Sequence, residues 1–526
     1  MAEQPLAGAG RSSRLPLALG FVLLGAAYLA WGISSRLLSF GGDNATYLLI
    51  AQDLSPLGHA SPGAAGYAHQ SYYPPLYPLV LAATGVSRSL PSAHAATVGM
   101  LLGAFAVLFA WCRSLGLSTF ASAALTLAFA WVRGTYLMAL EILSEPLYLL
   151  LTLTAIALTQ SIVERRGRGP WAGAALAVGG ATLTRSAGLA MGIAFVLVMA
   201  ARRPRRWPWA IALAVLPTVA WMKLGGNSAY GHILADRYRG ADLGTLIARL
   251  ASQVAVLWGD WQSLFADRPE PLVETVVSLL TAAAAVGTVR RAWRFELDAI
   301  YLLGYLALIV IWPFPGEMAR FLGVILPLVL VHAALALRDG LARWAGEPAR
   351  RAAWALISGM GLAVLVPQLA LTAARFHEGA GPELGELRRS PMWFDQDTGT
   401  AVKTLRFAAR LEDGLARVES LVPANDCVLS VKPSLVGLLG HRRAVYAPPS
   451  TVDDAAFRSE LEHLGCRYLF LIDATTQSAT RLYPGERLAG ELEELDVTRL
   501  DDRPDGRVVS ILARWAPRAS QPSDSR

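Results

Sequence analysis

The sequence predicts a mainly α-helical, polytopic membrane protein of about eleven spans, with a small C-terminal α/β domain outside the cytoplasm. Of its 526 residues, 54% are apolar and only 17% are charged. The apolar residues gather in blocks of about 17–25, the length that crosses roughly 30 Å of hydrocarbon. The last part of the chain is polar and carries runs typical of β-strands, so we expect it to fold outside the membrane.

We read eleven such blocks along the chain. They lie near 15–35, 93–112, 118–133, 141–161, 170–184, 187–201, 207–223, 270–289, 297–312, 321–337 and 352–373. The stretch 170–201 could also be one long hydrophobic region in place of the two spans that flank Arg185. The first block is too long for a signal peptide and lacks a small-residue cleavage site, which favours a retained helix.

The net charge of +7 is unevenly distributed. Residues 376–526 hold 19 Lys/Arg against 23 Asp/Glu, a balance of −4, which leaves +11 for the rest. Those positive charges fall in every second loop, the positive-inside pattern. The arginines concerned are Arg11 and Arg14; Arg113; Arg165, Arg166 and Arg168; Arg202, Arg203, Arg205 and Arg206; Arg290, Arg291 and Arg294; and Arg338, Arg343, Arg350 and Arg351. We therefore expect a bacterial inner-membrane protein with a cytoplasmic N-terminus and a periplasmic tail, and nucleic acid is not needed to explain the charge.

This topology predicts a transmembrane domain over 1–375 and a periplasmic α/β domain over 376–526. It leaves two long outer loops, 36–92 and 224–269. Within the first loop, the Pro-rich run 74–81 is too short to span, so we expect it at the interface or as a broken helix packed on protein.

The tail shows a helical pattern over 402–421, then β-rich runs at 427–431, 468–472 and 508–512 with helical stretches between them. Neither a Gly-rich phosphate loop nor metal-ligand spacing stands out, so no cofactor and no metal are expected. Cys427 and Cys466 each precede a strand-like run. They admit a disulfide in an oxidising periplasm or two separately buried thiols, and we favour the thiols.

Charged side chains near or inside membrane segments are costly and usually mark function. The predicted topology puts acids and bases together on the outer side, as a site needs if a carboxylate activates a hydroxyl and arginine holds a phosphate. The set comprises Asp43, Asp53, Glu141, Glu145, Arg185, Asp236, Glu317 and Arg320.

Each candidate also has a structural interpretation. Asp43 could be the N-cap of a helix that starts at Asn44. Glu141 and Glu145, four apart, would share one face near a helix N-terminus, where the helix dipole favours acids. Arg185 lies in an outer turn, where the charge rule disfavours arginine, so a phosphate partner is favoured over snorkelling.

The remaining candidates are weaker. Glu317 and Arg320, spaced i to i+3, could pair with each other. Tyr72, Tyr73 and Tyr77 could be interfacial aromatics. His69 is a lone histidine in a loop and is expected to be structural or solvated.

Five short segments occur in order along the membrane part. They are an acid followed by a Tyr-containing helix (43–51), Tyr-Pro-Pro-Leu-Tyr-Pro-Leu (73–79), Glu-Pro-Leu (145–147), Arg-Ser-Ala-Gly (185–188) and Arg-Phe-Leu-Gly-Val-Ile-Leu-Pro (320–327). Together they resemble the GT-C class of polytopic membrane glycosyltransferases, and most the bacterial protein O-mannosyltransferases and lipid A aminoarabinose transferases. The likeness covers roughly residues 15–375. Two departures are Tyr73, where the family has His before the Pro-Pro pair, and Asn44, where eukaryotic-type protein mannosyltransferases have a second acid.

The resemblance implies transfer of a sugar from a polyprenyl-phosphate donor to an extracytoplasmic acceptor (a lipid, a glycan or a protein), with inversion. Asp43 would be the general base, and Arg185 and Arg320 would hold the donor phosphate. The candidate substrate contacts are Glu141, Glu145, Tyr72, Tyr73, His69 and Glu317. The alternative is a multi-pass transporter or flippase of a lipid-linked or amphipathic solute. It is disfavoured because no internal repeat stands out and the charges gather at one face.

Overall fold

The structure is a computed structural model. It describes residues 20–29, 42–55, 63, 73–164, 170–223, 238–265, 271–312, 318–340, 355, 359, 398–474, 479–501 and 503–516. The chain forms two compact units. Unit 1 comprises 1–35, 72–77 and 94–380, and unit 2 comprises 36–71, 78–93 and 381–526.

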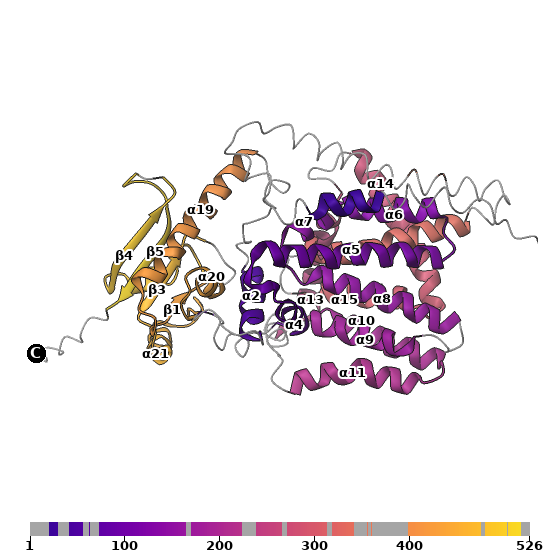
Figure 1. Ribbon diagram of the computed structural model, residues 1–526, viewed down its shortest axis with the longest axis horizontal. Coiled ribbons are helices and arrows are strands. Elements are labelled where there is room, and N and C mark those ends of the chain that lie inside the picture. Colours follow the sequence, from indigo (N-terminus) through magenta and orange to yellow (C-terminus); the bar gives the residue numbers. More distant parts are fainter. Residues whose placement is uncertain are drawn as a thin grey trace, which may run out of the picture. The chain divides into compact units, whose positions relative to one another are not determined.

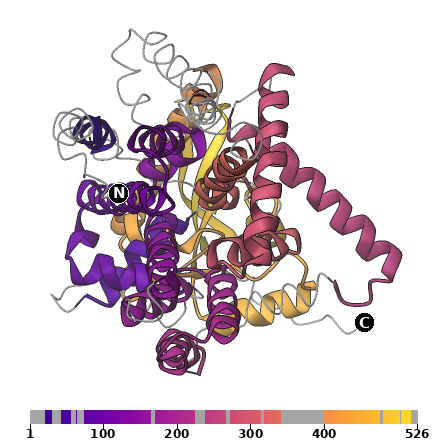
Figure 2. The same cartoon turned by 90° about the vertical axis from the view of Figure 1, so that its right-hand side faces the viewer.

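Unit 1 is a helical bundle in which α8, α9, α10 and α11 lie side by side (Figure 1), and several of its helices are seen end on in Figure 2. Its helices are Gly20–Leu29, α5 (Leu90–Ser114), α6 (Thr119–Trp131), α7 (Arg133–Leu140), α8 (Glu145–Glu164), α9 (Trp171–Thr184), α10 (Gly188–Arg202), α11 (Trp207–Lys223), α13 (Leu243–Ser263), α14 (Pro271–Trp293), α15 (Leu297–Val310) and Met318–Gly340. Helix α4 (Leu76–Ala83) is divided between the two units, and so is α5, whose residues 90–93 belong to unit 2.

Ten of the eleven predicted apolar blocks coincide wholly or in part with these helices, and the last, 352–373, lies outside the described residues apart from 355 and 359. The stretch 170–201 forms two helices that separate at Arg185. Within the described ranges, four helices are long and apolar enough to cross a membrane: Leu90–Ser114, Glu145–Glu164, Val273–Trp293 and Met318–Gly340. The mainly helical membrane fold is therefore confirmed, whereas the number of spans stays a prediction.

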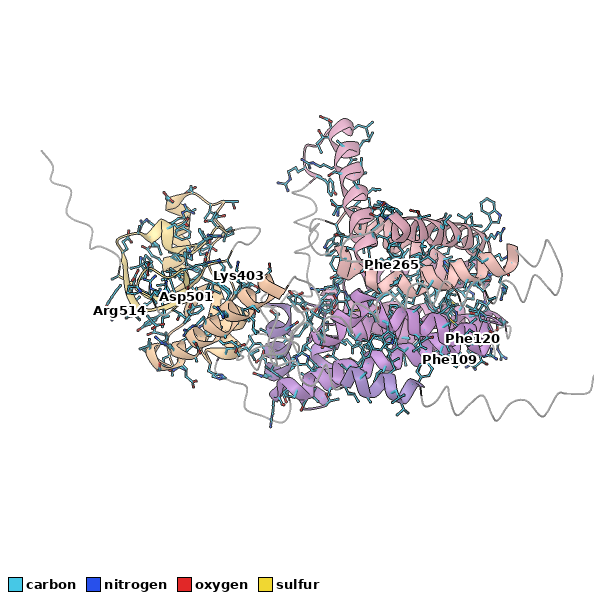
Figure 3. The ribbon with its side chains drawn as sticks, turned by 90° about the horizontal axis from the view of Figure 1, so that it is seen from above. Phe109, Phe120, Phe265, Lys403, Asp501 and Arg514 are labelled. Atoms are coloured by element: carbon cyan, nitrogen blue, oxygen red, sulfur yellow. A yellow bond between two sulfur atoms is a disulfide. The ribbon has the colours of Figure 1, made fainter. Side chains whose placement is uncertain are left out.

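Large apolar side chains are exposed on the outside of the bundle. Phe120, labelled in Figure 3, is 66% exposed, and Ile193 and Trp209 are 61% and 70% exposed. Exposed apolar side chains of this size on several helices are typical of a surface that faces lipid. Small residues let the helices approach closely: a Cβ on Gly287 would lie 2.2 Å from the carbonyl oxygen of His332.

The arginine-rich loops meet one another in pairs. Arg338 Nη1 donates to the carbonyl of Leu115 at 2.8 Å, and Arg202 donates to the carbonyl of Arg294. The positive-inside pattern assigns these loops to one side of the membrane. Which side they face stays a prediction.

A buried polar network lies near the same helix ends. Arg291 donates to both oxygens of Asp298, at 2.6 and 2.9 Å, and His332 Nε2 lies 2.8 Å from Asp298 Oδ2. The other ring nitrogen of His332 lies 2.8 Å from the hydroxyl of Thr288. Asp298 and His332 are almost fully buried, so the network joins α14, α15 and the Met318–Gly340 helix through paired charges.

Hydropathy alone does not reveal α13, which lies in the predicted outer segment 224–269. Its N-cap is Asp242, whose carboxylate accepts a 2.7 Å hydrogen bond from the amide of Thr245. That bond lowers the pKa of Asp242. The helix is amphipathic, with the exposed apolar residues Leu243 and Ile247, so a window that averages apolarity over every face overlooks it.

Unit 2 contains a five-stranded mixed sheet in the order β2-β1-β3-β5-β4. Strands β1 (Val428–Ser430), β2 (Ala444–Tyr446) and β3 (Tyr468–Ile472) are parallel. Strands β5 (Val508–Trp515) and β4 (Leu492–Arg499) extend the sheet antiparallel to β3. The expected α/β domain is therefore present.

Helices cover both faces of this sheet. Helix α21 (Asp454–Leu464) packs Phe457 and Leu461 against Leu429 and Leu469. Helix α19 (Thr398–Leu421) lies on the other face, where Gly414 allows close approach to Ser510 of β5. The other elements of unit 2 are α2 (Asp43–Asp53), η1 (Val86–Arg88), α20 (Pro433–Leu439) and η3 (Gly485–Leu488).

Cys427 and Cys466 form a disulfide, with Cα atoms 4.9 Å apart. The prediction of two separate thiols is therefore wrong. The reason is the strand order: β1 and β3 are parallel neighbours with Val428 opposite Tyr468, so the residues just before the two strands lie side by side. Strand order cannot be read from the local sequence.

Candidate functional site

Three charged residues predicted for the outer side meet at one end of the bundle in unit 1. Glu145 is fully buried, and its Oε1 lies 2.7 Å from Arg185 Nη1. Arg320 Nε donates to the same carboxylate oxygen. The two arginine side chains are 10% and 24% exposed, so the carboxylate lies beneath two guanidinium groups that retain some access to solvent.

Each member of this cluster occupies a helix terminus. Glu145 is the first residue of α8, where the helix dipole favours an acid, and Pro146 behind it is tolerated in the first turn. Arg185 is the extended residue between α9 and α10, with φ −148° and ψ 143°. Arg320 is in the first turn of the Met318–Gly340 helix. The start of α8, the end of α9 and the start of the Met318–Gly340 helix therefore lie at the same end of the bundle, with α9 antiparallel to the other two.

A ring and a hydroxyl group fix the orientation of the guanidinium groups. The Arg185 and Arg320 guanidinium carbons lie 5.3 and 5.9 Å from the centre of the Phe321 ring, within cation–π range. Arg185 Nη1 also donates to Ser144 Oγ at 3.0 Å. Tyr305 donates its hydroxyl to the carbonyl of Phe321 at 3.2 Å, which holds the ring-bearing segment in place.

Counted over Glu145, Arg185 and Arg320, the cluster carries a net charge of +1. A carboxylate in this position is costly to bury by itself, and two guanidinium groups offset that cost. The carboxylate in turn keeps both arginines in a fixed arrangement suited to an anion with several oxygens, such as a phosphate. Across the described part of the chain, no group of three or more His, Cys, Asp or Glu side chains could hold a metal ion.

The expectation that Glu141 and Glu145 share one helix face is wrong. Glu141 is the C-cap of α7 and has an extended backbone, with φ −119° and ψ 149°. Helix α8 begins only at Glu145, after a break that the continuous apolar block 141–161 does not reveal. Of the two acids, Glu145 makes the ion pairs described above.

Asp43 belongs to unit 2, where it is the first helical residue of α2. The N-cap of α2 is Gly42, so the interpretation of Asp43 as the N-cap is wrong. An acid in the first turn still benefits from the helix dipole. Asp53 is the last residue of the same helix.

The Pro-rich element is only partly described. Tyr73 is half-buried, and α4 follows three residues later. The hydroxyl of the buried Tyr77 lies 2.8 Å from Thr97 of α5, which anchors the start of α4. This short, partly buried helix agrees with the expectation of a segment packed on protein. The other predicted site residues lie outside the described part of the chain: His69, Tyr72, Asp236 and Glu317.

The structure adds residues that the sequence analysis did not single out. Phe321 contacts both arginines, and Ser144 accepts from one of them. Each is the chain neighbour of a predicted site residue, which is a usable signal. The Asp298–His332 pair had a signal too, because an acid and a histidine inside apolar blocks are unusual.

No protein-family model matches the chain, and no curated protein matches it. Among solved structures it is similar to the Archaeoglobus fulgidus oligosaccharyltransferase tethered with an acceptor peptide (11% identity, 93% of this chain, 74% of that chain, TM-score 0.48). It is also similar to ArnT from Cupriavidus metallidurans bound to undecaprenyl phosphate (13% identity, 95% of this chain, 98% of that chain, TM-score 0.46). A third similar structure is that of the mycobacterial arabinofuranosyltransferase AftD (14% identity, 95% of this chain, 40% of that chain, TM-score 0.44). At these identities and TM-scores, no residue's role is carried over from any of them.

Proposed function

We propose that this protein is an integral membrane glycosyltransferase of a bacterial inner membrane. It moves a sugar from a polyprenyl-phosphate donor to an acceptor outside the cytoplasm. The observation that carries the proposal is the buried cluster of Glu145, Arg185 and Arg320 at the end of an apolar helix bundle. A lipid-linked phosphate fits this site, because its negative charge complements the positively charged cluster and its apolar tail is soluble in the surrounding membrane.

In this proposal, Arg185 and Arg320 bind the phosphate of the donor. As the bond between the anomeric carbon and the phosphate oxygen breaks, that oxygen gains negative charge, which the guanidinium groups stabilise more strongly than in the ground state. Glu145 holds the guanidinium groups in place and does not contact the reacting atoms. The polyprenyl phosphate departs with the electron pair of the broken bond.

Asp43 is proposed as the general base. It takes the proton of the acceptor hydroxyl while that oxygen bonds to the anomeric carbon on the face opposite the leaving phosphate, so the configuration inverts. Asp43 and the two arginines belong to different units, so their roles are tested separately.

The test uses the full-length protein in proteoliposomes with a panel of undecaprenyl-phosphate-linked sugars, and measures release of undecaprenyl phosphate. Arg185→Met and Arg320→Met keep an apolar stem of similar length but remove the charge. We expect each to lower turnover by about 10²-fold or more, the scale for loss of one donor to a developing oxyanion. Asp43→Asn should reduce turnover by about 10²–10⁴-fold.

Arg205→Ala is the matched control, because Arg205 is an exposed arginine in a predicted cytoplasmic loop. Wild-type turnover in both arginine variants would contradict the phosphate role. Movement of the labelled lipid across the bilayer without release of undecaprenyl phosphate would instead support the alternative of a flippase.

A further inference from the structure

Helix α2, which carries Asp43, is buried far more than a surface loop helix. Residues 44–51 are buried without a break, including Asn44 and Thr46. Eight successive buried positions cover every face of a helix, so α2 must have packing partners all around it. Within unit 2, one of those partners is α20 of the C-terminal domain.

The first contact between the two helices lies directly before Asp43. The carbonyl of Gly42 accepts hydrogen bonds from the Thr46 amide at 2.9 Å, the Thr46 hydroxyl at 2.8 Å and the Ser434 hydroxyl at 3.2 Å. Gly42 has φ +89°, a conformation that residues with a side chain rarely adopt. A Cβ there would also lie 3.2 Å from Ser434 Oγ. The backbone next to Asp43 is thus held by a side chain from the C-terminal domain.

The second contact lies one turn further along α20. A Cβ on Gly437 would stand 3.0 Å from Leu49 Cδ1 and 3.2 Å from the carbonyl oxygen of Gly63. A Cβ on Gly63 would in turn lie 2.1 Å from the carbonyl oxygen of Gly437. Two glycines therefore allow direct backbone contact here, and Leu49 packs on the surface that they leave open. Ser434 and Gly437 are three residues apart, so they lie on the same face of α20.

We propose that α20 is a positioning element for Asp43, and that Ser434 and Gly437 are its positioning residues. The C-terminal domain then has a defined role in the reaction: it sets where the carboxylate of the base stands. The inference rests on the proposed function, in which Asp43 is the base. Neither residue touches the reacting atoms. Their effect passes through the backbone of Gly42 and the packing of Leu49.

The expected effects follow from the two contacts. Ser434→Ala removes one hydrogen bond and should lower kcat about 2–10-fold. Gly437→Ala forces Leu49 or the backbone of Gly63 to move, and a misplacement of about 1 Å lowers turnover by about 10²-fold. In both variants the KM for the donor should stay within about twofold, because the donor-binding arginines are untouched. Ser434→Thr keeps the hydroxyl and should retain most of the activity.

The experiment measures two quantities on the full-length protein in proteoliposomes. The first is hydrogen exchange of the peptide that covers α2, which needs no substrate. The second is kcat and KM with the undecaprenyl-phosphate-linked sugar that gives the highest turnover in the panel above. Ser420→Ala is the control, because Ser420 is an exposed serine of the same domain whose hydroxyl donates to the carbonyl of Arg417 in its own helix.

We expect faster exchange of α2 and a lower kcat in Ser434→Ala and Gly437→Ala, with neither change in Ser420→Ala. Wild-type exchange and wild-type kcat in both variants would overturn the inference, and so would a raised KM at unchanged kcat. Asp43→Asn separates this failure from that of the proposed function. If Asp43→Asn turns over like the wild type, the role of the base is wrong, whatever the α20 variants do.

Discussion

Replacing Glu145 with glutamine tests whether the buried carboxylate holds the arginine pair together. Glu145→Gln keeps the shape of the side chain and removes its charge. With charge centres about 4 Å apart, each of the two ion pairs contributes roughly 4 kcal/mol of attraction at an effective dielectric constant of about 20. Much of that gain is offset by desolvation, so the measured loss should be near the 3–5 kcal/mol found when one partner of a buried pair is removed.

A loss of this size should lower the Tm of the purified protein by roughly 6–10 °C, at the ratio of about 2 °C per kcal/mol that applies to domains of about 250 residues. The assay is thermal unfolding in detergent, followed by intrinsic tryptophan fluorescence. Glu164→Gln, at the exposed far end of the same helix, is the matched control and should shift stability by no more than about 0.5 kcal/mol. Added undecaprenyl phosphate should restore part of the loss in Glu145→Gln by replacing the missing negative charge. An unchanged Tm in Glu145→Gln would refute this account of the cluster.

Three further predictions concern stability. Replacing both Cys427 and Cys466 by serine opens a loop that the disulfide closes over 39 residues, so the free energy of unfolding of the domain should fall by about 4 kcal/mol. Hydrogen exchange of β1 and β3 should then be faster, and unchanged protection would contradict the prediction. Asp298→Asn should lower the free energy of unfolding by about 3–5 kcal/mol, because it removes the buried carboxylate that pairs with Arg291. Asp339→Asn is the control and should change the Tm little, since the Asp339 side chain is 41% exposed. Equal Tm shifts in the two variants would refute the role of the network. Gly287→Ala should destabilise the protein by about 1–3 kcal/mol, because its methyl group would meet the backbone of His332. Gly99→Ala in α5 should be neutral or stabilising, since a Cβ there would have nothing within 4 Å. A larger loss of stability in Gly99→Ala than in Gly287→Ala would contradict the close helix contact.

Much of the bundle could be predicted because a membrane span is a local property. A run of apolar residues of the right length identifies itself, and even the division at Arg185 was visible as a polar interruption. The amphipathic helix α13 could not be found this way, since its polar face dilutes the average. The break between Glu141 and Glu145 was also hidden, because Ile142 and Leu143 continue the apolar run through a segment that is not helical.

The site could be predicted in its residue types but not in its contacts. Charge in an apolar setting indicated Glu145, Arg185 and Arg320, yet the sequence offered Glu317 as the partner of Arg320, because neighbours along a helix are the only pairs that spacing reveals. Glu317 lies outside the described residues, and in the described part of the chain Arg320 donates to Glu145, which is 175 residues away. Long-range pairing of this kind, like the strand order that joins Cys427 to Cys466, depends on how the elements pack.

Binding of the bare lipid phosphate tests the central claim most directly. The measurement compares the Kd of undecaprenyl phosphate with that of undecaprenol, which has the same chain and no phosphate, for the wild type and for Arg185→Met/Arg320→Met. Charge-assisted hydrogen bonds contribute about 1.5–3 kcal/mol each, so two arginines should favour the phosphate by roughly 10²–10⁴-fold. We predict that the wild type shows this preference and that the double variant binds both lipids alike. Equal affinity of the wild type for the two lipids would contradict the account.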